Sequence, residues 1–262
     1  MIYIIPKPTD TSDDNSTGMV MRELSRMNEV YEILDLSLIN PLDTGLSGEV
    51  IWVCGIRQDG YEFECIKALS LHNRLINRPE AIVTCASKVS TSVLLMRDRI
   101  ETPTTLFCND LDMAASFIKD YGKVVYKPVY GFDGNGIILI QSVEELPPPP
   151  WYLQQYIWND RDYRVFVLDG EPIGAIVRQS DTLTHNIHQG GFGRSVVIDE
   201  EMGRIASEAA SCVGVDYGGV DLISDGDTYT VLEVNGTPNW HCMTTPIPCL
   251  LAEYLLKQCE KR

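Results

Sequence analysis

The first 79 residues alternate short apolar runs with polar turns, a pattern that predicts a small α/β unit. Apolar runs bounded by turn residues are typical of buried strands, and apolar residues three or four apart are typical of helices. The order strand, helix, strand, strand, helix favours a parallel sheet. The expected elements are strands at Met1–Ile5, Val30–Leu36 and Val50–Cys54, a helix capped by Ser16 or Thr17 and running to about Met27, and a helix at Tyr61–Leu75.

Residues 80–150 are expected to form a small central lobe. Four consecutive prolines, 147–150, end it, and a stiff connector between lobes is expected there because proline fixes φ. A protein-binding polyproline segment is the alternative. The expected elements are a helix within Glu80–Pro103, a helix at Leu111–Tyr121, and strands at Val124–Lys127 and Ile137–Gln141 around a glycine-rich loop.

Residues 151–262 are expected to form a second, C-terminal lobe built from hairpins and two helices. Asp-Gly turn signals between alternating segments predict two β-hairpins. The expected elements are strands at Trp151–Ile157, Tyr163–Leu168 and Ile173–Arg178, a helix at Glu200–Val213, a hairpin within Gly219–Asn235, and a helix at Pro248–Lys257.

The hairpin within Gly219–Asn235 carries three oxygen-bearing side chains, Asp221, Glu233 and Asn235. Glu233 and Asn235 are two residues apart, so they point to one face of their strand. Asp221 joins that face only if the hairpin has an odd-length loop, which would pair it with Val231, or an equivalent bulge. Such oxygen ligands suit Mg²⁺ shared with phosphates. Acids that merely solvate one side of a hairpin are the alternative.

Composition and charge narrow the classes of partner. With 21 Lys and Arg against 37 Asp and Glu, the chain carries a net charge of −16. This charge disfavours binding to nucleic acid and to anionic membranes, so an anionic substrate needs a locally basic pocket. The eight cysteines include no C-x-x-C pair or zinc-like spacing. Without a signal-peptide pattern or a membrane-length apolar run, a cytoplasmic protein is expected.

The glycine-rich loop after Lys127 does not match the common nucleotide motifs. It leads into a strand rather than a helix, unlike a dinucleotide fingerprint, and no G-K-[ST] follows. Gly131, Gly134 and Gly136 would let backbone N–H groups approach an anion, and Lys127 could reach phosphates. A mobile hairpin tip is the alternative. Farther on, the extended segment Leu153–Ile157 could read an adenine edge, and Asp162 could bind ribose, although both are also ordinary strand residues.

Taken in order, these parts resemble the RimK-type ATP-grasp ligases. The blocks are S-K-V-S-T-S, K-P-x-x-G-x-x-G-x-G, Q-Q-Y-I, D-Y-R-V-F-V, A-I-V-R, H-N-I-H-Q-G-G, G-G-V-D-L-I and L-E-V-N-G-T-P, and they cover about residue 80 to the C-terminus. The resemblance implies an α/β chain with α+β lobes, in which an ATP-grasp fold follows the small parallel N-terminal domain. It also implies ATP and Mg²⁺, or Mn²⁺ in its place, as cofactors.

The resemblance also implies roles for individual residues. Two lysines would bind the ATP phosphates, a glutamine and a tyrosine the adenine, and an aspartate the ribose. The implied residues are Lys88 and Lys127 for phosphates, Gln155 and Tyr156 for adenine, Asp162 for ribose, Thr184, His185 and Asn186 beside the nucleotide and the reacting acid, Arg164 and Arg178 for a carboxylate or phosphoryl group, and Asp221, Glu233 and Asn235 for metal.

Two positions depart from the family pattern. Gln189 stands where the family has an arginine that helps to hold an anionic acceptor, and Gln155 stands where the hinge usually has an acid. The departure at Gln189 makes the identity of the acceptor an open question. The second matters less because adenine is read partly by backbone groups.

The implied reaction joins an amino acid, L-glutamate above all, to a carboxylate acceptor through an acyl phosphate, releasing ADP and phosphate. Arg178 and Asn186 would act at the reacting centre, and His188 would be either a general base or a structural hydrogen bonder. The acidity of the chain favours a small coenzyme as acceptor over an acceptor that is bound to nucleic acid. No membrane partner is expected, and a homo-oligomer is possible. The alternatives are a ligase for a protein tail or amino-acid carrier, and a non-catalytic ATP-binding module.

Overall fold

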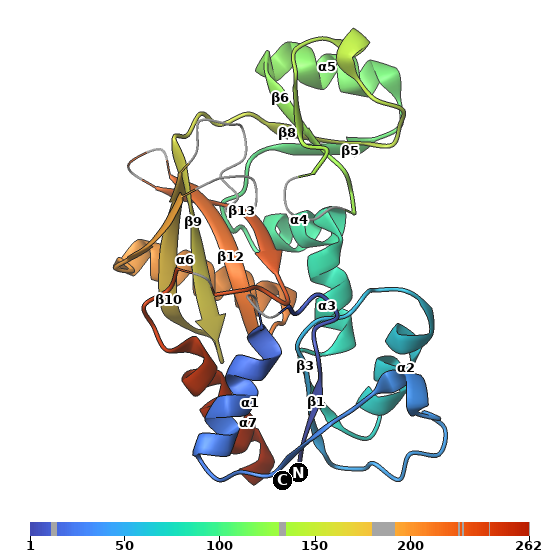
Figure 1. The fold of residues 1–262 in the computed structure, drawn as a ribbon. Coiled ribbons are helices and arrows are strands. Elements are labelled where there is room, and N and C mark those ends of the chain that lie inside the picture. The colour runs from blue at the N-terminus through green and yellow to red at the C-terminus, as the bar shows by residue number, and fades with distance from the viewer. Residues whose placement is uncertain are drawn as a thin grey trace.

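A computed structural model describes residues 1–11, 15–130, 135–179, 192–224, 226, 228–240 and 242–261. In this part of the chain the strands form three sheets, arranged as in Figure 1. The N-terminal sheet is parallel, the central sheet is antiparallel, and the C-terminal sheet is antiparallel. None of the helices in the described ranges is long and apolar enough to cross a membrane.

The N-terminal sheet confirms the expected parallel α/β arrangement. Its strand order is β2-β1-β3-β4. The elements are β1 (Ile2–Ile5), α1 (Ser16–Arg26), β2 (Tyr31–Ile33), the 3₁₀ helix η1 (Leu36–Leu38), β3 (Val50–Val53), α2 (Gly60–Ser70) and β4 (Arg74–Ile76). The helix expected to run to Leu75 ends at Ser70, because Leu75 belongs to β4.

The cap of α1 differs from the expected one. Asn15, rather than Ser16 or Thr17, is the N-cap residue, and its side chain accepts a hydrogen bond from the backbone N–H of Gly18 at 2.6 Å. The backbone N–H groups of Ser16 and Thr17 instead donate to the carboxylate of Asp10, at 3.1 and 3.0 Å. Two side chains therefore satisfy the free N–H groups of this helix end.

The central sheet has the strand order β5-β8-β6-β7. Its elements are β5 (Thr105–Cys108), α5 (Leu111–Tyr121), β6 (Val124–Lys127), β7 (Ile138–Ile140), η2 (Val143–Glu145) and β8 (Trp151–Gln155). The four prolines lie between η2 and β8, and β8 pairs with β5 and β6. The prediction that the prolines connect two lobes is therefore wrong, since the chain on both sides of them belongs to this sheet.

The C-terminal sheet has the order β11-β10-β9-β12-β13 and packs one face on α6. Its elements are β9 (Arg161–Leu168), β10 (Glu171–Gln179), β11 (Phe192–Val196), α6 (Glu200–Val213), β12 (Tyr217–Ser224), β13 (Tyr229–Asn235) and the last helix α7 (Ile247–Glu260). Valines of β9 and β12, including Val165 and Val220, join the residues of α6 in one apolar cluster. Because side chains alternate along a strand, their neighbours Arg164 and Asp221 point to the other face.

The single helix expected within Glu80–Pro103 is two helices, α3 (Pro79–Ala86) and α4 (Lys88–Arg97). Both pack toward the C-terminal sheet, since Ala81 and Leu95 belong to the same apolar cluster as α6. Figure 1 shows α4 between the central sheet and β13. The division into units 1–79, 80–150 and 151–262 stays a prediction, although β8, which follows residue 150, pairs with strands of the central sheet.

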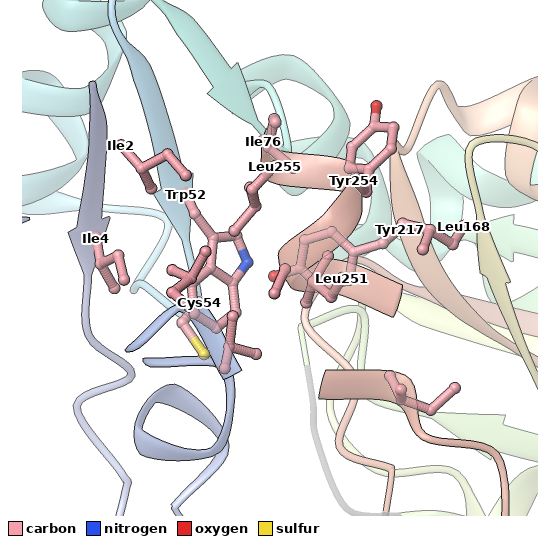
Figure 2. Packing of buried hydrophobic residues seen from close by; sticks show 14 of the residues in the cluster. Ile2, Ile4, Trp52, Cys54, Ile76, Leu168, Tyr217, Leu251, Tyr254 and Leu255 are labelled. Atoms are coloured by element: carbon pink, nitrogen blue, oxygen red, sulfur yellow. The ribbon is translucent and has the colours of Figure 1, made fainter. Parts of the chain in front are cut away.

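A continuous core joins the N-terminal sheet to α7. Figure 2 shows Trp52 of β3 and Cys54, the residue after β3, near Leu251 and Leu255 of α7, and Trp52 is fully buried. This cluster also includes Tyr217 of β12. The beginning and the end of the chain are thus packed together, and they fix the N-terminal unit against the C-terminal sheet.

Candidate active site

Asp221 and Glu233 lie on one face of the C-terminal hairpin. Between β12 and β13, Ser224 pairs with Tyr229 across the loop 225–228, an even-length connection that alone would place Asp221 opposite Leu232. A register shift next to Asp221 leaves Leu232 bulged out and sets Asp221 opposite Glu233. The bulge expected from the sequence is confirmed, whereas the odd-length loop and the pairing with Val231 are wrong.

Asp221 of β12 is held by two arginines, one from the neighbouring strand β9 and one from β10, the next strand beyond it. Its carboxylate accepts from Nε and Nη2 of Arg164, both at 2.7 Å, and Nη2 of Arg178 lies 3.0 Å from Oδ2. Nε of Arg178 also donates to Asp162 at 2.5 Å. Asp162, Arg178 and Asp221 are all buried. Strand pairing produces this network, because Asp162 lies opposite Arg178 and Arg164 lies opposite Asp221.

The charges of this network depend on one another. Burial alone would raise the pKa of Asp221, but Arg164 and Arg178 outweigh burial and hold it well below its usual range. Burial likewise opposes the charge of Arg178, and the carboxylates of Asp221 and Asp162 outweigh it and raise the pKa of that guanidinium. Asp221 and Arg178 therefore both carry their charges at neutral pH.

Lys88 faces the same hairpin from the first residue of α4. Its Nζ lies 3.4 Å from Oε2 of Glu233. The helix starts here because Ser87 caps it, accepting from the N–H of Ser90 at 3.2 Å. The N–H of Lys88 also donates to the carbonyl of Val129, at 3.5 Å, which ties α4 to the segment that follows β6. The predicted lysine and the predicted metal ligand are thus neighbours.

Lys127 is the last residue of β6, and its Nζ donates to Oε1 of Gln154 at 2.6 Å. Burial lowers the pKa of Lys127 to about 8, although the carboxylates of Glu233 and Asp221 oppose the shift and Lys88 adds to it. The charges that act on Lys127 belong to the hairpin and to α4. An ammonium with its pKa so close to neutral gains its full charge when an anion approaches.

The glycine-rich loop is described only in part. Gly136 has φ +75°, and a Cβ on it would lie 2.9 Å from Cγ of Pro128, so the turn into β7 requires a glycine. Gly131 and Gly134 lie outside the described residues, as do Thr184, His185, Asn186, His188 and Gln189. The roles expected for these residues stay predictions.

The expected adenine hinge begins at the last residue of β8. The backbone N–H of Gln155 donates to the carbonyl of Thr104 at 2.8 Å, and that of Tyr156 donates to the carbonyl of Lys123 at 3.3 Å. Both backbone N–H groups thus already donate hydrogen bonds within the protein, so other groups of this segment would have to contact the adenine. The ribose role of Asp162 also stays a prediction, and its carboxylate would have to be shared with Arg178.

The hairpin suits a magnesium ion that is shared with phosphates. Nδ2 of Asn235 lies 3.4 Å from Oε1 of Glu233, and reversing the amide would set two oxygens side by side. Mg²⁺ usually takes one or two carboxylates together with substrate phosphates. Within the described ranges no group of three or more His, Cys, Asp or Glu residues forms a ready metal cluster. Asp221 could become a metal ligand only if its carboxylate gave up a contact with Arg164 or Arg178.

Three residues of this region were missed from the sequence. Gln154 contacts Lys127, and Tyr152 and Ser92 are hydrogen-bonded to each other at 2.7 Å behind it. The strand alternation that places Tyr152 and Gln154 on one face was visible in the sequence. Nothing in the sequence linked that face to Lys127.

Comparison with known proteins agrees with this arrangement. Residues 85–257, well over half of the chain, match the family model of the RimK-like ATP-grasp domain. The tetrahydromethanopterin:alpha-L-glutamate ligase of Methanocaldococcus jannaschii is 30% identical over 228 residues, covering 78% of each chain. The coenzyme gamma-F420-2:alpha-L-glutamate ligase of the same organism is 30% identical over 206 residues, covering 71% of this chain and 72% of that one.

A solved structure supports the fold. The ATP-grasp ligase PsnB, complexed with a minimal precursor, superposes with a TM-score of 0.80 over 98% of both chains, at 20% identity. The same ligase has been solved with Mg and ADP. The expectations of an ATP-grasp fold and of a ligase that uses ATP are thereby confirmed. The chain belongs to the RimK-like ATP-grasp family, whose members are ATP- and Mg²⁺-dependent ligases that form carbon–nitrogen bonds.

Proposed function

We propose that this ligase joins L-glutamate to a carboxylate of a small coenzyme-type acceptor. The observation that carries the proposal is the gathering of Lys88, Lys127, Arg164 and Arg178 around Glu233 and Asp221, in an otherwise acidic chain. A concentration of cations on one face suits a triphosphate beside a carboxylate acceptor. Two curated relatives that match most of the chain are named as glutamate ligases acting on coenzymes.

The reaction needs a carboxylate to become an acyl donor. A carboxylate oxygen of the acceptor attacks the γ-phosphorus of ATP, the bond to the β-phosphate oxygen breaks, and ADP leaves. The amine of glutamate then attacks the acyl carbon of the acyl phosphate, loses a proton, and inorganic phosphate leaves. Positioning and charge neutralisation provide most of the catalysis in such phosphoryl transfers.

Each described residue has a proposed part in these steps. Lys88 and Lys127 hold the phosphates as cations, and Arg164 and Arg178 keep the reacting carboxylate or phosphoryl group in place through fork-shaped donors. Glu233 and Asn235, with Asp221 as a further ligand, would hold Mg²⁺, or Mn²⁺ in its place. The bound cation would neutralise phosphate charge. His188 remains the proposed candidate for a general base, and Thr184, His185 and Asn186 are proposed to approach the nucleotide.

The remaining assignments also belong to the proposal. Gln155 and Tyr156 would border the adenine, Asp162 would contact the ribose, and Gly131, Gly134 and Gly136 would bring backbone groups toward the phosphates. The protein is proposed to act in the cytoplasm, without a nucleic-acid or membrane partner. A homo-oligomer is compatible with the proposal.

Incubation with ATP, Mg²⁺, each amino acid and a candidate acceptor tests the proposal. Tetrahydromethanopterin and the coenzyme of the second relative are the first acceptors to try. We expect ADP release that requires both glutamate and acceptor, together with a mass increase of the acceptor by one glutamyl residue. ATP binding with no turnover in any combination would instead favour a non-catalytic ATP-binding module.

A further inference from the structure

Gln154 lies at the centre of a hydrogen-bonded group that connects three strands of the central sheet. It is 2% exposed. It pairs with Thr105 of β5 on one side and with Val125 of β6 on the other. Lys127, two residues along β6 from Val125, is a diagonal neighbour on the same face. The side chain of Gln154 therefore lies on the face of the sheet between its neighbours on β5 and β6, within reach of Lys127.

The amide of Gln154 can be oriented in only one way. A lysine ammonium has only donors, so the atom 2.6 Å from Nζ of Lys127 must be the carbonyl oxygen. The amide nitrogen then donates to Oγ1 of Thr105 at 3.1 Å and lies 3.4 Å from the hydroxyl of Tyr152. Both ends of the amide are held, which fixes the position of the oxygen that receives Lys127.

The chain of contacts continues into α4. The hydroxyl of Tyr152 lies 2.7 Å from Oγ of Ser92. Ser92 stands one helical turn after Lys88, so both face the same side of α4. Since α4 packs with α6 and the C-terminal sheet, this contact joins the central sheet to the part of the molecule that carries Glu233.

We propose that Gln154 is a positioning residue, which sets Lys127 against the ATP phosphates and couples its place to that of Lys88 through Tyr152 and Ser92. This inference rests on the proposed phosphate role of Lys127. A neutral amide suits the task because it orients the ammonium without cancelling its charge. A carboxylate at the same place would form an ion pair and reduce the attraction for phosphate.

Isothermal titration calorimetry with Mg-ATP tests the inference on the full chain. Gln154→Met keeps the volume but removes the acceptor, and we expect ATP affinity to fall about 10- to 150-fold, the worth of one charge-assisted hydrogen bond. Lys127→Met is the reference variant and should lose at least as much affinity. Tyr152→Phe removes only the hydroxyl that leads to Ser92, and we expect a loss of about threefold.

The outcomes separate the two proposals. Unchanged affinity in Lys127→Met would remove the phosphate role of Lys127. A clear loss in Lys127→Met with affinity within twofold of wild type in Gln154→Met would overturn the positioning role alone. Thermal unfolding of every variant shows whether it is folded.

A second measurement distinguishes positioning from general damage, and it also decides the matter should Gln154→Met fail to fold. ATP affinity is expected to fall as Lys127 loses its proton, above a midpoint set by its pKa of about 8. Glu233 of β13, Asp221 of β12 and Lys88 of α4 are the charged groups that influence it. Gln154→Glu should move the midpoint to higher pH, and Gln154→Met to lower pH. An unmoved midpoint in the nearly isosteric Gln154→Glu would contradict the inference.

Discussion

Asp221 and Glu233 lie directly opposite each other on neighbouring strands because a single residue, Leu232, is bulged out beside them. Their charges are balanced differently. Asp221 is buried and held by Arg164 and Arg178, whereas the side chain of Glu233 is 36% exposed and has Lys88 at 3.4 Å. Of the two carboxylates, Glu233 is therefore the one more readily available to a metal ion and its phosphates.

Replacing Glu233 by glutamine tests that role. The amide keeps the size of the side chain but loses the charge that would attract a divalent cation. We expect ligase turnover in Glu233→Gln to fall by about 100-fold or more, and the Mg²⁺ concentration at half-maximal rate to rise. Glu171→Gln, at an exposed position on β10 of the same sheet, is the matched control and should retain full activity. Full turnover in Glu233→Gln would refute the metal assignment.

Lys127 should take up a proton when ATP binds near pH 8. In the protein without ATP, the amine of Lys127 is about half protonated at this pH because burial lowers its pKa to about 8. Bound phosphates would raise that pKa, so about half a proton should be absorbed. Calorimetry in buffers with different ionisation enthalpies measures the uptake.

Lys127→Arg is the control for this measurement, because a guanidinium stays charged at this pH. It should bind ATP without the uptake that depends on residue 127. Equal uptake in the two proteins would show that Lys127 is not the group that titrates.

The arginine pairs of Asp221 predict the response of stability to acid. The pKa of Asp221 is lowered in the folded state, so its contribution to stability is fully present above the unfolded-state pKa of about 4. That contribution is lost as the pH falls below this value toward the folded-state pKa. Urea unfolding at pH 7 and at pH 3 measures the change.

Asp221→Asn should be less stable than wild type at pH 7, by about 3–5 kcal/mol, because it breaks a buried ion-pair network. It should also lose less stability between pH 7 and pH 3. Asp112→Asn, at an exposed position of α5, should behave like wild type. If Asp221→Asn lost as much stability as wild type between pH 7 and pH 3, the arginines would not lower the pKa of Asp221 in the folded state.

Asn77 connects the N-terminal unit to the strands that carry the hairpin. Its fully buried amide donates to the carbonyls of Tyr217 and Gly236, at 2.8 and 2.6 Å, and accepts from the N–H groups of Asp216 and Tyr217, at 2.6 and 3.1 Å. Asn77→Leu leaves these backbone groups without their partner. We expect it to reduce the free energy of unfolding by about 2–5 kcal/mol.

Chemical denaturation measures this loss, with the exposed Asn109→Ala as a control of the same residue type. A loss below 1 kcal/mol (about the worth of one ordinary hydrogen bond) would contradict the structural role given to Asn77.

Local patterns sufficed for much of the fold. The strand Val124–Lys127 and the helices Leu111–Tyr121 and Glu200–Val213 have the predicted bounds, because each combines a clear periodicity with a turn or cap at its ends. The break at Ser87 was missed, since residues on both sides favour a helix. The break involves a contact that is distant in sequence, between Lys88 and Val129.

Part of the candidate site was also predictable from the sequence. The shared face of Glu233 and Asn235 follows from strand alternation. The place of Lys127 before the glycine-rich loop indicated its role, and the resemblance supplied Lys88. The hold of Arg164 and Arg178 on Asp221 was not predictable, because it depends on β9 lying between β10 and β12. The choice of Gln155 over Gln154 passed over the glutamine that contacts Lys127, which only the pairing of β6 with β8 identifies.

A crystal structure with Mg²⁺ and a non-hydrolysable ATP analogue would show whether Lys88, Lys127 and the hairpin receive the triphosphate and its metal ion. We expect triphosphate oxygens within about 4 Å of Nζ of both Lys88 and Lys127, the ordinary reach of an ion pair. We also expect Mg²⁺ coordinated by Glu233 and Asn235. A nucleotide bound away from both lysines, or a metal ion with no ligand on Glu233, would contradict the proposed site.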